Sequence, residues 1–179
     1  MRKRVPPIRD SFSLYFKCMK YRKLLLEELA TVKEEFVKFL AVNSVVANDW
    51  EKLKLENSQR VEELIELFSD LFWEKSLSNI KCVEFRSPDQ LMVFHFGEKQ
   101  AEMLELRVPA EAGVDLSNAD HLRNLAEGKI KFDKGAPEMF SAVKNDLKDR
   151  NMELFELIEN GARPCPETFY YGLKAMAVM

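Results

Sequence analysis

The sequence predicts an α+β protein in which a long N-terminal helical arm or helical hairpin, coiled-coil-like, precedes a three-stranded antiparallel meander packed with three C-terminal helices. The first observation is that no glycine or proline occurs from Ile8 to Ser87, although these residues interrupt helices most strongly. The second is that all six glycines lie at or beyond Gly97, where the hydrophobic period becomes that of short strands. The expected parts are a basic flexible arm (residues 1–11), a helical region (12–76) and an α+β head (77–179).

Composition places the chain among globular proteins. Of its 179 residues, 46% are hydrophobic and 32% are charged. No apolar run approaches the roughly 18 residues of a membrane span, and the basic start lacks the apolar core of a secretory signal. Cys18, Cys82 and Cys165 are too few and too scattered for a disulfide framework or a zinc site. We expect an intracellular protein, cytoplasmic or nuclear, with reduced thiols and no cofactor or metal.

Apolar residues of the helical region recur at alternating spacings of three and four, which is typical of a helix-packing seam. Leu26, Val37 and Leu40 widen this stripe and favour a bundle over a narrow zipper. Asn57 is a polar position at a stutter, so it either sets the register or rotates into solvent. The expected interface with a helical partner comprises Leu25, Leu29, Val32, Phe36, Phe39, Trp50, Leu53, Asn57, Val61, Leu64 and Phe68.

The weakest helical stretch runs from Ala41 to Asp49, which is rich in asparagine and β-branched residues. Ser44 or Asn48 would cap a second helix at this point. Two alternatives stay open: a hairpin of residues 12–42 against 48–76, or a continuous helix of ~65 residues that reaches about 98 Å. Wide apolar faces favour the hairpin or a strong kink, because they need a partner and the chain supplies one.

The head is expected to begin with strands at residues 81–86, 91–96 and 102–108, joined by turns at Ser87–Gln90 and Gly97–Gln100. The middle strand is apolar on both faces, as expected of a central strand. Three helices should follow. The first is capped by Ser117 or Asn118, the second starts at Pro137 with a stripe of Phe140, Val143, Leu147, Leu154 and Ile158, and the third starts at Pro166.

Residues that often carry chemistry are present but isolated. His95 and His121 have no Cys, Asp or Glu at ligand spacing, so both are expected to be structural. Cys165 is the most reactive-looking thiol, because it precedes Pro166 at an expected helix N-terminus, but capping or exposure explains it. No clustered glycines suit a phosphate-binding loop. The sequence therefore predicts no catalytic, metal-binding or cofactor-binding residues.

The net charge of −3 is unevenly distributed, with a basic N-terminus and an acidic stretch at residues 61–74. Phe12, Tyr15 and Phe16 interleave with the N-terminal cations, a combination that can bind phosphates or a lipid surface. The alternative without a binding role is that the N-terminal arm is a solubilising tail and the cations form the solvent-exposed face of a helix. The candidate polyanion-binding residues are Arg2, Lys3, Arg4, Arg9, Lys17, Lys20, Arg22 and Lys23.

These features favour a non-enzymatic assembly subunit, in which the helical arm oligomerises or docks on a protein partner and the head presents a binding face. The layout is similar, in architecture alone, to coiled-coil-plus-head subunits of chromosome-segregation assemblies, and this resemblance implies no site residues. One alternative is a nucleic-acid-associated regulator that uses the basic N-terminus. The other is an enzyme subunit whose site requires a partner.

Overall fold

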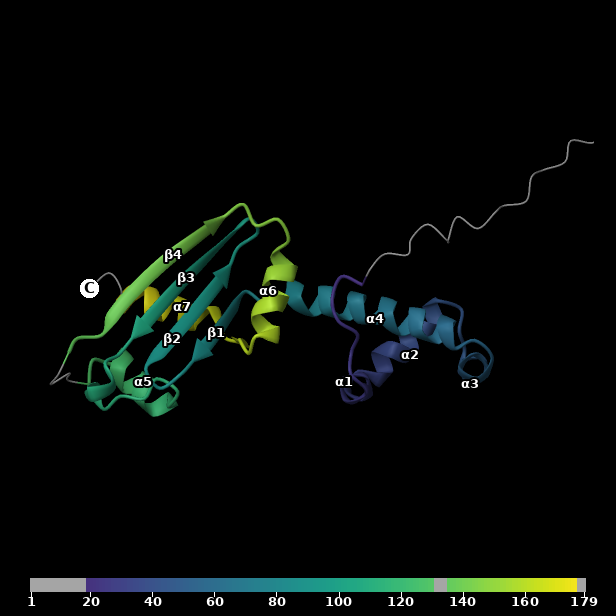
Figure 1. The fold of residues 1–179 in the computed structure, drawn as a ribbon, viewed down its shortest axis with the longest axis horizontal. Coiled ribbons are helices and arrows are strands. Elements are labelled where there is room, and N and C mark those ends of the chain that lie inside the picture. Colours follow the sequence, from purple (N-terminus) through teal and green to yellow (C-terminus); the bar gives the residue numbers. More distant parts are fainter. Residues whose placement is uncertain (1–18, 131–134, 177–179) are drawn as a thin grey trace, which may run out of the picture. The chain divides into compact units, whose positions relative to one another are not determined.

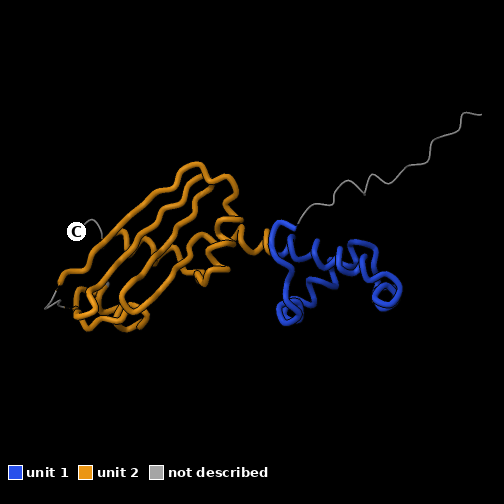
Figure 2. The backbone as a smooth tube through the Cα atoms, in the orientation of Figure 1, with its two compact units in different colours: residues 1–72 blue, residues 73–179 orange. Residues whose placement is uncertain are grey.

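A computed structural model describes residues 19–130 and 135–176 and divides the chain into two compact units, residues 1–72 and 73–179 (Figures 1 and 2). The α+β class predicted from the sequence is confirmed, with helices as the regular structure in the described part of unit 1 and a sheet with helices in unit 2. The boundary falls within the long helix α4 (Ser58–Ser78). No helix in the described ranges has both the length and the apolar composition that a bilayer crossing requires.

Unit 1 folds back on itself around α4. The ring of Phe68 on α4 packs against Phe36 and Phe39 of α2, with centroids 4.9 and 5.4 Å apart. Trp50 of α3 packs edge-on against Phe36 at 5.5 Å. The continuous long helix is therefore wrong, because the apolar stripe packs within the chain. The helices are α1 (Leu26–Thr31), α2 (Lys33–Val42), α3 (Ala47–Glu56) and α4 (Ser58–Ser78).

Among the described residues the first helix begins at Leu26, whereas the sequence predicts a helix that starts at residue 12. The backbone N–H of Tyr21 donates to the Asp70 carboxylate and that of Leu24 donates to Ser69 Oγ, each at 3.0 Å. Both Tyr21 and Leu24 are buried. Because side chains of α4 satisfy these amides, the segment gains burial without helical hydrogen bonds. Residues 12–18 of the predicted helix lie outside the described residues.

The helical region of unit 1 is broken between α2 and α3 and again between α3 and α4. The break within 41–49 is confirmed, but α3 begins after Val46 instead of Ser44 or Asn48. A second break at Asn57 separates α3 from α4, so the predicted unbroken helix over 48–76 is wrong. Asn57 is exposed, and its Oδ1 accepts the Arg60 amide at 3.0 Å, which caps α4. Asn57 is thus a capping residue and does not lie in a helical seam.

Unit 2 is built on a five-stranded antiparallel sheet in the order β4-β3-β2-β1-β5. The predicted meander forms its centre, but the expected three-stranded sheet is incomplete because a strand is added at each edge. The polar turns close as expected, with the Gly97 amide donating to the Gln100 carbonyl at 2.9 Å. The strands are β1 (Cys82–Arg86), β2 (Gln90–Phe96), β3 (Gln100–Arg107), β4 (Glu138–Asn145) and β5 (Arg163–Pro164).

Strand β4 replaces the first part of a predicted helix. All eight of its residues pair with β3, from Glu138 opposite Arg107 to Asn145 opposite Gln100. This pairing satisfies the backbone, and Pro137 stands just before the strand, where a missing N–H is tolerated. The predicted buried stripe is wrong for its first two members, since Phe140 and Val143 are 41% and 57% exposed.

The helices of unit 2 follow their capping signals. Asn118 accepts the amides of Asp120 and His121 and starts α5, as predicted. The predicted second helix is confined to α6, which Asp149 caps and which ends before Gly161 in the left-handed conformation (φ +99°). The helix expected after Pro166 is confirmed as α7. The elements are a 3₁₀ turn η2 (Ala110–Ala112), α5 (Ala119–Ala126), α6 (Arg150–Glu159) and α7 (Glu167–Met176).

The main core of unit 2 lies between one face of the sheet and α7 (Figure 1). Leu91 and Val93 of β2 are fully buried there, and Tyr170 and Leu173 of α7 cover them. The opposite face is closed at one end only, where the guanidinium of Arg150 on α6 lies over the buried ring of Phe96 at 5.9 Å. The two faces of the sheet therefore differ in how completely they are covered.

Candidate functional site

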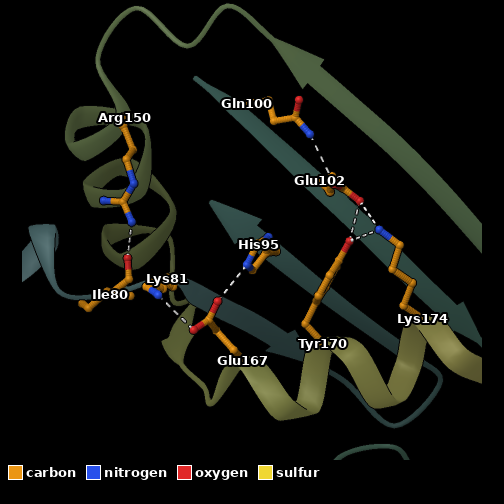
Figure 3. A network of polar contacts seen from close by, with 9 residues as sticks. All are labelled: Ile80, Lys81, His95, Gln100, Glu102, Arg150, Glu167, Tyr170 and Lys174. Carbon is orange, nitrogen blue, oxygen red and sulfur yellow. Dashed lines mark hydrogen bonds and ion pairs between the residues drawn. The ribbon is translucent and has the colours of Figure 1, made fainter. Parts of the chain in front are cut away.

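A polar network joins α7 to the sheet at one end of the covered face (Figure 3). The His95 ring of β2 stacks on Tyr170 with centroids 4.7 Å apart. His95 Nε2 lies 3.1 Å from Glu167 Oε1, and Lys81 Nζ lies 3.2 Å from Glu167 Oε2. The hydrogen bond from His95, followed by that from Lys81, lowers the pKa of the Glu167 carboxyl. These contacts fix the N-terminal turn of α7 against β2.

A second carboxylate anchors the middle of α7. Glu102 of β3 accepts hydrogen bonds from the Tyr170 hydroxyl at 2.5 Å and from Lys174 Nζ at 2.6 Å (Figure 3). The Lys174 bond, then the Tyr170 bond, lowers the pKa of Glu102. Burial, followed by the Glu102 contact, raises the pKa of Tyr170. The arrangement favours a neutral phenol beside an ionised carboxylate, which is a stable structural pair.

Beside this network lies a polar hollow of about 730 Å³. Lys81, His95 and Glu167 line it on one side, and the start of α6 lines it on the other. Arg150 is committed to the fold, because its guanidinium donates to the carbonyls of Leu77 (3.2 Å) and Ile80. Burial lowers the pKa of this guanidinium. The charged groups shown in Figure 3 are thus used to hold elements together.

Metal binding finds no support in the part of the chain that the structure describes, where no three His, Cys, Asp or Glu side chains gather closely enough for an ion. Cys82 of β1 and Cys165, which directly follows β5, are free thiols, and the Cys165 amide donates to the Cys82 carbonyl at 3.0 Å. The contact between the thiols raises the pKa of Cys165, so this thiol is a poor nucleophile. The charged residues of the polar network and the two cysteines therefore serve to hold the elements of unit 2 together.

The opposite face of the sheet carries the more informative site. We name this opposite face the open face. Its large apolar side chains alternate along the strands with those that point into the core. The Phe85 and Phe94 rings meet edge to face at 6.1 Å. In Figure 1 this face of the sheet is turned toward the viewer, α7 lies behind the sheet, and α6 lies at one end only. The residues of the open face are Phe85, Met92, Phe94, Met103 and Phe140.

The open face resembles a protein–protein interface in its exposure and in its polar neighbours. Four of its residues are half-buried, and Phe140 is exposed. The Arg107 guanidinium lies 4.8 Å from the Phe140 ring centroid, and Arg107 Nε donates to Glu105, which is itself buried. This bond lowers the pKa of Glu105. Aromatic and methionine side chains beside an arginine are the composition that protein interfaces favour.

The predicted helix-partner interface is used largely inside unit 1. Leu64 and Phe68 are buried, and Leu29, Val32, Phe36, Phe39, Trp50, Leu53 and Val61 are half-buried. Leu25, by contrast, is 60% exposed, and Asn57 is an exposed cap. The stripe therefore contributes a packed intramolecular face and offers little continuous surface for an external helix.

The predicted polyanion-binding residues fall into two groups. Arg2, Lys3, Arg4, Arg9 and Lys17 lie outside the described residues. Arg22 donates to both oxygens of Glu28 at 2.6 and 2.7 Å, and Lys23 pairs with Glu62. Lys20 Nζ lies over the Tyr21 ring at 5.0 Å. The described cations thus have contacts within unit 1 that a phosphate would have to replace.

Sequence reasoning missed the open face, although a signal for it existed. The stretch from Leu91 to Phe96 is apolar at every position except His95, and burial on both faces was the expected reason. The structure gives only one of these faces a helical cover along its length. The sequence pattern cannot distinguish an apolar strand face that no helix or second sheet covers from one that is buried in a core.

The fold and site define an α+β protein whose antiparallel sheet has α5 and α7 packed on one face, and on the other an apolar patch with α6 at one end only. The model of the Family of unknown function (DUF6495) matches residues 19–177, and the chain belongs to this family. No curated protein matches the chain, and no solved structure does.

Proposed function

We propose that this protein is a non-enzymatic interaction subunit whose unit 2 binds another protein chain through the open face. The observation that carries the proposal is the grouping of Phe85, Met92, Phe94, Met103 and Phe140 on one sheet face, of which α6 covers one end only. Removing apolar surface from water contributes about 25 cal/mol per Å², so such a face gains free energy when a partner covers it.

The polar surroundings indicate what the partner carries. The side chain of Arg107 is 54% exposed beside Phe140, and Glu105 already neutralises part of its charge. A partner with apolar side chains for the patch and a hydrogen-bond acceptor for the guanidinium fits this surface. Exposed Leu26, Val42 and Leu55 in unit 1 are further apolar positions for a second contact.

In-cell photo-crosslinking tests the proposal directly. A benzophenone amino acid replaces Phe94 on the open face, and a matched variant carries it at Arg123, an exposed position of α5. We expect discrete protein adducts from position 94 and none from position 123, because only the former lies in the binding face. Equal adduct patterns at both positions, or none at position 94 in a variant with wild-type thermal stability, would overturn the proposed function.

The alternative of a nucleic-acid-associated regulator depends on the basic N-terminus, of which only Lys20, Arg22 and Lys23 lie among the described residues, and it stays a prediction from the sequence. Its test is the salt dependence of polyanion binding, which is independent of the open face.

A further inference from the structure

We infer that one partner of unit 2 is a second copy of this chain, joined by antiparallel pairing of the two β4 strands around Ser141. The inference goes beyond the proposed function, because it uses the edge of the sheet instead of the open face, and it names a partner and a register. It starts from an unusual edge strand. Strand β4 is eight residues long, and among the described residues no strand pairs with its outer edge.

Burial within one chain does not account for the length of β4. Seven of its eight residues are exposed, and only Met139 is half-buried against the core. Apolar side chains on both faces of the strand therefore remain exposed, with Phe140 at 41% and Val143 at 57%. A long edge strand with apolar residues and no proline or bulge in its interior is a template for pairing with another strand.

The hydrogen-bonding pattern fixes which backbone groups of β4 are available. Gly97 donates to Gln100 and Val108 donates to Asp89, so even-numbered residues of β3 bond to β2. Odd-numbered residues of β3 then bond to β4, and their register partners in β4 are even-numbered. The outward N–H and C=O groups consequently belong to the odd-numbered residues of β4, which are Met139, Ser141, Val143 and Asn145.

Two copies can pair through these outward groups in one register that also matches charge. With Ser141 opposite Ser141 of the second copy, Met139 meets Val143 and Phe140 meets Ala142. The same register places Glu138 opposite Lys144 at both ends of the paired strands. A shift that centres the pair on Ala142 would instead place Glu138 opposite Asp146, and opposed like charges destabilise a ladder.

Lys144 has room for this second carboxylate. Its Nζ lies 2.7 Å from Glu153 Oε2 of α6, and its side chain remains 63% exposed. Glu138 is exposed as well. Because the even-numbered side chains share the sheet face with Phe94 and Met103, pairing would join the two open faces into one continuous surface. The dimer thereby leaves the open face available to a further partner.

Proline substitution separates edge pairing from folding. Ser141→Pro removes an outward N–H that β3 does not use, whereas Ala142→Pro removes one that bonds to β3. We expect the full-length wild type to sediment as a dimer at micromolar concentration, and Ser141→Pro to be a folded monomer with its thermal transition retained. Ala142→Pro is the control that should lose the transition.

Cysteine and charge variants test the register. Ser141→Cys should yield a covalent dimer under a glutathione redox buffer, with a 141–141 peptide identified by mass spectrometry; Ala142→Cys and wild type are the controls for residues 18, 82 and 165. Glu138→Lys should raise the dimer Kd by about tenfold, since two attractive cross-strand pairs become repulsive. Adding Lys144→Glu should restore most of this loss.

Two results would overturn the inference. One is a monomeric wild type up to about 100 μM, and the other is a dimer that persists in Ser141→Pro and forms no 141–141 bond. Neither result bears on the photo-crosslinks from position 94 to other proteins, so the proposed function would stand or fall separately.

Discussion

The Tyr170 hydroxyl gives the most quantitative test of how α7 is held on the sheet. Tyr170 is 1% exposed, and its hydroxyl donates to Glu102 at 2.5 Å. Tyr170→Phe removes this donor and also the acceptor of the Lys174 Nζ hydrogen bond at 3.1 Å, while the ring still fills the core. A hydrogen bond to a charged group contributes about 1.5–3 kcal/mol. Since Lys174 continues to pair with Glu102, no charge is orphaned, and we expect a loss near the lower end, about 1.5 kcal/mol.

The stability difference between wild type and Tyr170→Phe should depend on pH at both extremes. The pKa of Glu102 is lowered by Lys174 and Tyr170, so its contribution is present above about pH 4.5 and lost as pH falls through the folded pKa. The pKa of Tyr170 is raised by burial and by Glu102, so its contribution is present below about pH 10 and lost as pH rises through the folded pKa. A plateau is expected between these limits.

Urea unfolding followed by tryptophan fluorescence measures this difference. Trp73 of unit 2 packs edge-on against Phe155 at 5.1 Å, and a Trp50→Phe background removes the signal of unit 1. Tyr171→Phe is the matched control, because Tyr171 is 54% exposed on the same helix. A Tyr170→Phe loss below about 0.5 kcal/mol at pH 7, or a difference that is flat from pH 3 to pH 11, would refute the reasoning.

Three further outcomes are expected. Asn57→Ala should destabilise unit 1 by about 1 kcal/mol through loss of the α4 cap, measured by Trp50 fluorescence in a Trp73→Phe background with Gln59→Ala as control; an unchanged midpoint would contradict the capping role. Gly135→Ala should lower the melting temperature, because its Cβ would lie 2.6 Å from Pro109 Cγ at φ +73°, whereas Gly172→Ala has open space on α7 and should be neutral or stabilising. Deleting residues 1–9 should reduce the salt slope of duplex DNA binding by up to about 0.9 per lost phosphate contact, and absence of binding by full-length protein at about 50 mM salt would contradict the polyanion prediction.

Local signals predicted the parts of the fold that local chemistry determines. The Asn118 cap of α5, the Gly161 end of α6 and the start of α7 after Pro166 all follow from residues within one turn of the boundary. The alternation and turns from Cys82 to Arg107 likewise predicted the central meander, because a short turn joins each pair of neighbouring strands. The α+β class follows from these elements together.

Distant contacts account for the predictions that were wrong. The segment around Tyr21 is extended because Ser69 and Asp70, nearly fifty residues later, accept its amides. Strand β4 lacks a clear apolar–polar alternation and has Phe140 and Val143 at helical spacing, so only its pairing with β3 reveals a strand. The open face escaped prediction for a related reason, since a sequence cannot show whether a second layer covers an apolar strand.

Residue-resolved amide exchange of β4 tests most directly the claim that this strand pairs with β4 of a second copy of the chain. The amides of Phe140 and Ala142 bond to β3 and should be protected at every concentration, whereas those of Met139, Ser141 and Val143 point outward. We expect the outward amides to exchange rapidly in dilute protein and to gain protection as concentration rises through the dimer Kd. Rapid exchange of these three amides at every concentration up to about 1 mM, with Phe140 and Ala142 protected throughout, would contradict the claim.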